Sequence, residues 1–128
     1  MFDPGPVRVE FRPRGRVALR APLRWRTTTT HLVVPKGFES DGASIPALLW
    51  PLLGHPYSGS ILRAAILHDW EIVTRTAPSV VVHRRFYTAL RASGVGRVRA
   101  ALLYLGTRWF GPRFRQTPPL ARSRDRVP

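Results

Sequence analysis

The sequence predicts a single α+β domain in which a small antiparallel sheet precedes the helices. Two observations predict this class. Residues 7–34 contain short runs rich in alternating or β-branched side chains, and three later segments repeat apolar residues at helical spacing. The 128 residues, 44% of them hydrophobic, suffice for one modest core. We therefore expect one domain over residues 1–112, followed by a disordered Arg- and Pro-rich tail over residues 113–128.

Three segments predict the sheet. "VRVEF" and "RVALR", residues 7–11 and 16–20, alternate apolar and charged side chains on either side of a turn-like "RPRG". "LRWRTTTTHLVV", residues 23–34, is rich in β-branched and aromatic residues. We expect three to four short antiparallel strands with arginine on the outer face. Their apolar face is left for the helices to cover.

Three to four helices are expected after the strands. A short helical segment is predicted at residues 46–53, and longer helices at 60–74, 79–93 and 96–110. Pro78 stands at the entry of the 79–93 helix and Gly94 at its exit, as helix ends prefer. On the last helix the spacing predicts a stripe formed by Val98, Leu102, Leu105 and Trp109.

Composition bounds the partners and the chemistry. The absence of cysteine excludes disulfides, thiolate metal sites and cysteine nucleophiles. A formal net charge of +14 predicts an anionic partner, such as nucleic acid or an acidic neighbouring subunit. Lys36 is the only lysine among the 21 basic residues, however, and a GC-rich genome also produces a solvated Arg-rich surface. Both interpretations remain open.

No targeting segment is predicted. The N-terminal residues lack the apolar core of a signal peptide, and the longest apolar runs fall short of the roughly 18 residues that span a bilayer. The last helix could lie on an anionic membrane, but an ordinary domain helix is the favoured interpretation. We expect a protein of the cytoplasm, or of a particle assembled there.

Few polar residues lie in apolar surroundings, and they are the candidates for chemistry: Asp41, Ser44, His68, Asp69 and His83. If the 60–74 and 79–93 helices form a hairpin, His83 approaches His68, and Asp41 can join from the preceding loop. Imidazole and carboxylate ligands suit a divalent metal, and the same groups suit a general-base pair or a phosphate-handling site.

A purely structural account of these residues competes with the catalytic one. A histidine on an apolar helix face is more often a core residue than a ligand. Asp41-Gly42 is a turn signal, and Ser44 is a suitable cap for a helix that begins at Pro46. In this account the polar side chains form a buried hydrogen-bonded network without turnover.

The strings "VPKGFESDGASIPALLW", "GSILRAAILHDW" and "RRFYTALRASGV" resemble the domain of unknown function 1353 family, small proteins found mostly in tailed bacteriophages and prophages. The most specific piece is Gly-Phe-x-x-Asp-x-Ala-Ser-Ile-Pro, followed downstream by His68-Asp69. The resemblance implies a phage gene product and marks Asp41, His68 and Asp69. The chain departs from the family pattern at His83, where the family has Asp, and at "HDWEI", where the family has His-Asp-x-Leu-Tyr.

Three hypotheses follow. The first is a phage-encoded, metal-dependent hydrolase in which Asp41, His68 and His83 hold a divalent ion. In it Asp41, His68 and Asp69 are catalytic, with Asp69 a further ligand or the group that orients His68. The second is a structural or accessory virion protein that contacts other phage structural proteins. The third is a basic host-takeover factor that binds nucleic acid. The corresponding location is the host cytoplasm or the virion.

Overall fold

We analysed a computed structural model that describes residues 1–5, 7–13, 16–40, 59–75 and 77–110. Asp41, Ser44, the predicted 46–53 helix and the predicted 113–128 tail lie outside the described residues. The described part is an α+β arrangement, as the sequence predicts: antiparallel strands come first and helices follow.

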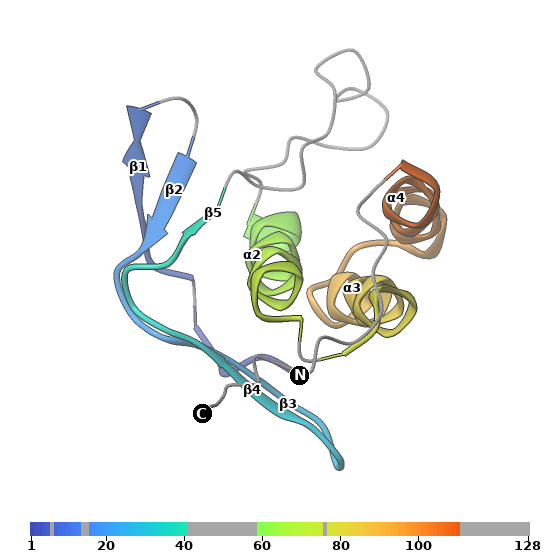
Figure 1. Cartoon of the computed structure of the whole chain (residues 1–128), viewed down its shortest axis with the longest axis horizontal. Coiled ribbons are helices and arrows are strands. Elements are labelled where there is room, and N and C mark those ends of the chain that lie inside the picture. Colours follow the sequence, from blue (N-terminus) through green and yellow to red (C-terminus); the bar gives the residue numbers. More distant parts are fainter. Residues whose placement is uncertain (6, 14–15, 41–58, 76, 111–128) are drawn as a thin grey trace, which may run out of the picture.

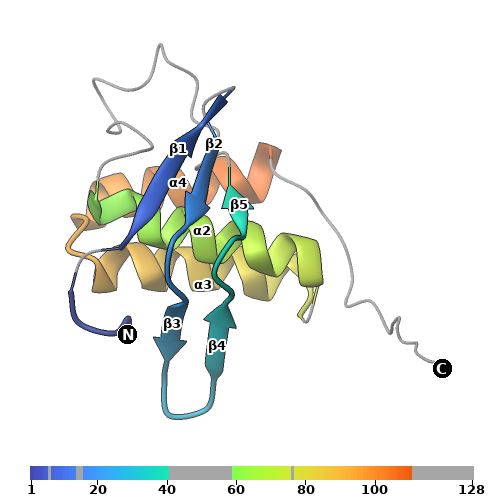
Figure 2. The same ribbon diagram turned by 90° about the vertical axis from the view of Figure 1, so that its left-hand side faces the viewer.

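The strands form two small antiparallel sheets rather than one (Figure 2). The first has the order β1-β2-β5 and the second pairs β3 with β4. The bounds are β1 Val9–Arg12, β2 Arg16–Leu19, β3 Leu23–Arg26, β4 His31–Val34 and β5 Glu39–Ser40. The N–H of Gly37 bonds to the carbonyl of Leu19 at 2.8 Å, and the N–H of Leu19 bonds to the carbonyl of Phe38 at 3.0 Å. These two bonds lie between the sheets and join them into one curved ribbon.

The threonine run of residues 27–30 turns the chain between β3 and β4. Its β-branched side chains favour a strand, but the backbone N–H of Thr27 donates to the carbonyl of Thr30 at 2.8 Å. The Thr27 hydroxyl also accepts bonds from the N–H groups of Thr29 and Thr30. A hydroxyl that satisfies nearby backbone donors stabilises a turn, which here outweighs the strand preference.

The three helices begin and end within one residue of the positions that the sequence predicts. They are α2 Gly59–Thr74, α3 Ser79–Ala92 and α4 Arg97–Phe110. The end of α3 depends on Gly94, whose φ of 94° is readily adopted only by glycine. The N–H of Val95 then bonds to the carbonyl of Leu90 at 3.0 Å and closes the helix end.

The described elements lie in layers, with α2 between the strands and α3, and α4 on the far side of α3 (Figure 1). Because neighbours cover α2 from two directions, it is apolar nearly all round. Six consecutive or near-consecutive residues are at most 4% exposed: Ile61, Leu62, Ala64, Ala65, Ile66 and Leu67. Trp25 of β3 meets Phe2 edge to face, with ring centroids 4.9 Å apart, on the strand side of this core.

The prediction of which side of α4 is buried is wrong. Val98 is 76% exposed and Leu102 is 41% exposed, whereas Ala100 and Leu103 are buried. The side of α4 that is buried against α3 therefore includes Ala100 and Leu103. Among the described residues, no helix has the length and apolar character needed to cross a membrane.

Candidate functional site

The two sequence motifs meet in space where β5 ends beside α2. The Ser40 hydroxyl at the end of β5 donates a hydrogen bond of 2.5 Å to the Asp69 carboxylate of α2. The ring of Phe38 packs edge-on against Trp70, with centroids 5.2 Å apart. Gly37, with a φ of 93°, lets the chain turn into this contact. The "GFES" string and the "HDW" string are therefore two sides of one contact.

His68 and His83 form a direct hydrogen bond between α2 and α3. His68 Nε2 and His83 Nδ1 are 2.8 Å apart, and the ring centroids are 5.0 Å apart. Both residues are buried, and the His68 ring also lies 4.7 Å from the ring of Phe86. The structure therefore confirms the prediction that His83 approaches His68.

The hydrogen bond restricts what the imidazole pair can offer. Two neutral imidazoles carry two N–H groups and two lone pairs, and the bond uses one of each. The other N–H and the other lone pair lie on the two outer nitrogens, His68 Nδ1 and His83 Nε2. When His68 Nε2 donates the bond to His83, the outer lone pair lies on His68 Nδ1, where it can accept a proton.

Burial keeps His68 neutral. Removal from water, together with an unfavourable electrostatic interaction with His83, lowers the pKa of His68 from 6.5 to about 3. The imidazole is then uncharged at every ordinary pH. A neutral imidazole is the form that accepts a proton from a substrate or binds a metal.

A second buried polar pair lies one turn further along α2, and it was not predicted from the sequence. Glu71 is only 1% exposed, and Arg85 of α3 donates a hydrogen bond to its Oε2 in a salt bridge. Glu71 Oε1 is also buried and has no hydrogen-bond partner among the described residues. The signal was present, because Ala64, Leu67 and Glu71 share one helical face.

Burial dominates the ionisation of Glu71. Removal from water raises its pKa from 4.5 to about 7, although the charge and the hydrogen bond of Arg85 act in the opposite direction. A carboxyl with this pKa changes its charge near neutral pH.

No group of three or more metal-binding side chains is present in the part of the chain that the structure describes. His68 and His83 face each other, and Asp69 bonds to Ser40. The ligand set of Asp41, His68 and His83 stays a prediction. If both inner ring nitrogens were to bind one ion, the His68–His83 bond would have to break.

The comparisons with known proteins agree with the motifs. Residues 17–107 match the model of a family described as "Protein of unknown function (DUF1353)". Two relatives from Sinorhizobium fredii (strain NBRC 101917 / NGR234) are the uncharacterized proteins y4jT and y4iH. They are 38% and 40% identical over 79 residues, which is 62% of this chain.

The chain spans only part of the curated relatives, 24% of the length of y4jT and 33% of that of y4iH. No solved structure matches the chain. The family model covers most of the chain, including both strings that meet at Asp69 and the helix that carries His83. The chain therefore belongs to the DUF1353 family of proteins of unknown function.

Proposed function

We propose that the protein is a metal-dependent hydrolase in which the carboxylates of Asp41 and Asp69 hold a divalent cation, and His68, oriented by His83, takes the proton of the attacking water. The observation that carries the proposal is the buried 2.8 Å bond between the two imidazoles, with the half-buried Asp69 next to His68 in the sequence. A base held by a second group is the usual arrangement in hydrolytic sites.

The carboxylates are better candidates for holding the cation than the imidazoles. Ser40 and Asp69 are hydrogen-bonded, and Asp41 is the residue after Ser40 in the sequence. The two imidazoles can keep their mutual bond only if they do not both bind the ion through their inner nitrogens. Oxygen ligands suit Ca²⁺, Mg²⁺ and Mn²⁺.

The low pKa of His68 favours a role beside a cation. An imidazole with a pKa of about 3 is a weak base toward ordinary water. A bound divalent cation makes its water far more acidic, so a weaker base suffices. The cation and the imidazole pair therefore complement each other in this proposal.

Calorimetric titration with Mn²⁺, Ca²⁺ and Mg²⁺, paired with hydrolysis of p-nitrophenyl acetate and bis(p-nitrophenyl) phosphate, tests the assignment. Asp41→Asn and Asp69→Asn are expected to lose cation binding and turnover. His68→Gln is expected to keep cation binding and to lose about 10²- to 10⁴-fold in kcat. Glu10→Gln is the matched control, because Glu10 lies on β1 with a half-exposed side chain. Wild-type protein that binds none of these cations and cleaves neither ester would refute the proposal.

A second candidate function is a structural or accessory role in a phage particle. The mutual satisfaction of the buried histidines favours it, since a polar network can specify a fold without turnover. In that case His68→Gln lowers Tm without any kinetic effect, and the intact protein copurifies with particles from an induced lysate.

The nucleic-acid hypothesis has support only from the net charge of +14, and it predicts DNA affinity that falls steeply with salt.

A further inference from the structure

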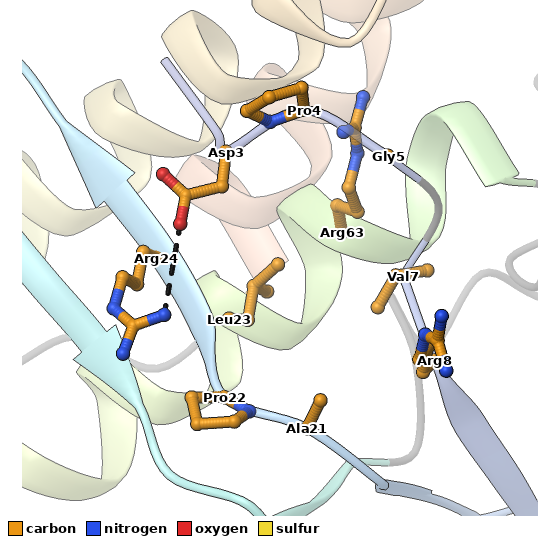
Figure 3. Close-up of a pocket in the computed structure, with 10 residues that line it drawn as sticks. All are labelled: Asp3, Pro4, Gly5, Val7, Arg8, Ala21, Pro22, Leu23, Arg24 and Arg63. Carbon is orange, nitrogen blue, oxygen red and sulfur yellow. Dashed lines mark ion pairs between the residues drawn. The ribbon is translucent and has the colours of Figure 1, made fainter.

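A cavity of about 110 Å³ lies on the side of α2 that faces the strands, between the N-terminal segment and the start of β3 (Figure 3). It is separate from the histidine pair, which faces α3. Polar and apolar atoms line it in about equal measure, and three of its four charged residues are arginines. The lining residues that matter for binding are Asp3, Val7, Arg8, Leu23, Arg24 and Arg63.

The three arginines come from three different segments. Arg8 directly precedes β1, Arg24 lies on β3 and Arg63 lies on α2. Figure 3 shows the apolar side chains of Leu23 and Val7 between them. Positive charges that line one cavity from several sides favour an anion there over a neutral or cationic ligand.

The arginines differ in how far they are neutralised. Asp3 lies 3.8 Å from Arg24 and 3.1 Å from Arg26, so its one negative charge is shared by two cations. Within the described residues, neither Arg8 nor Arg63 forms a salt bridge with a carboxylate. Three positive charges against one negative charge leave the cavity lining at +2.

Arg63 contacts the N-terminal segment through an interaction that uses none of its hydrogen-bond donors. Its guanidinium carbon lies 5.0 Å from the centroid of the Phe2 ring, a cation–π contact. A guanidinium stacked on an aromatic face keeps its N–H groups in the plane, where they can bind a planar or tetrahedral oxyanion. The positive φ of 100° at Gly5 shapes the backbone that forms the neighbouring wall.

We propose that this cavity binds the phosphate group of a phosphomonoester. The lining charge of +2 matches the charge of about −1.5 to −2 that a phosphomonoester carries at pH 7. At roughly 30 Å³ per water molecule, the volume equals that of three to four waters, which admits one phosphoryl group. Arginine can bind a phosphate group through two parallel hydrogen bonds. The inference is independent of the hydrolase proposal, since the cavity contains none of the residues of that site.

Isothermal titration of the full chain at 150 mM salt tests this binding, with glycerol 3-phosphate, glycerol, succinate and inorganic phosphate as probes. We expect glycerol 3-phosphate and inorganic phosphate to bind and glycerol not to bind. Arg8→Gln and Arg63→Gln should each weaken binding at least about tenfold. Arg84→Gln removes the same charge from an exposed position on α3 and should change the affinity less than about twofold.

Vesicles of phosphatidylcholine, with and without phosphatidic acid, separate a lipid headgroup from a soluble ligand. Binding to the phosphatidic acid vesicles but not to glycerol 3-phosphate identifies a lipid source, provided that Arg8→Gln and Arg63→Gln weaken it and Arg84→Gln does not. The proposal is overturned if no phosphomonoester binds, if succinate binds as tightly, or if Arg84→Gln weakens binding as much as the cavity variants. Tm measured on each variant shows whether a loss reflects unfolding, and Arg8→Gln changes an exposed side chain that the fold does not need.

Discussion

Replacement of Arg85 by Met is expected to destabilise the protein by about 3–5 kcal/mol at pH 8. Glu71 is 1% exposed and its Oε2 accepts a hydrogen bond from Arg85. Without the guanidinium, the folded state must either bury an uncompensated carboxylate or take up a proton. Urea unfolding at pH 8 and at pH 5 measures the cost. The loss should shrink to about 1 kcal/mol at pH 5, because Glu71, whose pKa is already raised to about 7, is then protonated in the folded state.

Two further variants serve as controls for the loss of the Arg85 guanidinium. Arg84→Met changes the neighbouring, exposed arginine and should stay within about 0.5 kcal/mol of the wild type. The double variant Glu71→Leu, Arg85→Met removes both members of the pair. It should be more stable at pH 8 than Arg85→Met alone, since no charge is left buried. An Arg85→Met variant that loses less than about 1 kcal/mol at pH 8 would contradict the buried pair.

The stability of the wild-type protein is expected to depend on pH through two buried groups that act in opposite directions. The pKa of Glu71 is raised from 4.5 to about 7, so its contribution is fully present below 4.5 and is lost as pH rises through 7. The pKa of His68 is lowered from 6.5 to about 3, so its contribution is fully present above 6.5 and is lost as pH falls toward 3.

The balance of the two groups can be tested with Glu71→Gln. When the pH falls from 8 to 5, Glu71 adds about 2.5 kcal/mol to the free energy of unfolding and His68 removes about 2 kcal/mol, at about 1.36 kcal/mol per pKa unit. The wild type should therefore be slightly more stable at pH 5 than at pH 8, by about 0.5 kcal/mol. In Glu71→Gln only the His68 effect remains, so this variant should be about 2 kcal/mol less stable at pH 5 than at pH 8.

Denaturant unfolding of the wild type and of Glu71→Gln at the two pH values gives the pH dependence of each free energy of unfolding. The effects of all other titrating groups are the same in both proteins, so they cancel when the two are compared. An unchanged pH dependence in Glu71→Gln would show that Glu71 does not titrate near neutral pH. His68→Gln, measured in the same way, should strengthen the stabilisation at pH 5, because the opposing group is gone.

The helices were largely predictable because their signals are local. The apolar spacing, Pro78 and Gly94 predicted both ends of α3 to within one residue. The continuous apolar character of α2 reflects a helix that is covered on two sides. The strands were less predictable. The two residues of β5 are too few to carry a periodic pattern, and β5 exists because Val17 and Ala18 of β2 offer an edge for pairing.

In the candidate site, too, local features could be predicted from the sequence and contacts between distant residues could not. The sequence by itself determined the fold class, the three helices, the family and the prediction that His68 and His83 approach each other. Only the tertiary structure decided that Ser40 bonds to Asp69, that Arg85 reaches the buried Glu71, and that Arg8, Arg24 and Arg63 surround one cavity. The physical reason is distance along the chain. A local pattern states which side of a helix is apolar, but a contact between residues 14 to 29 positions apart depends on how the elements pack.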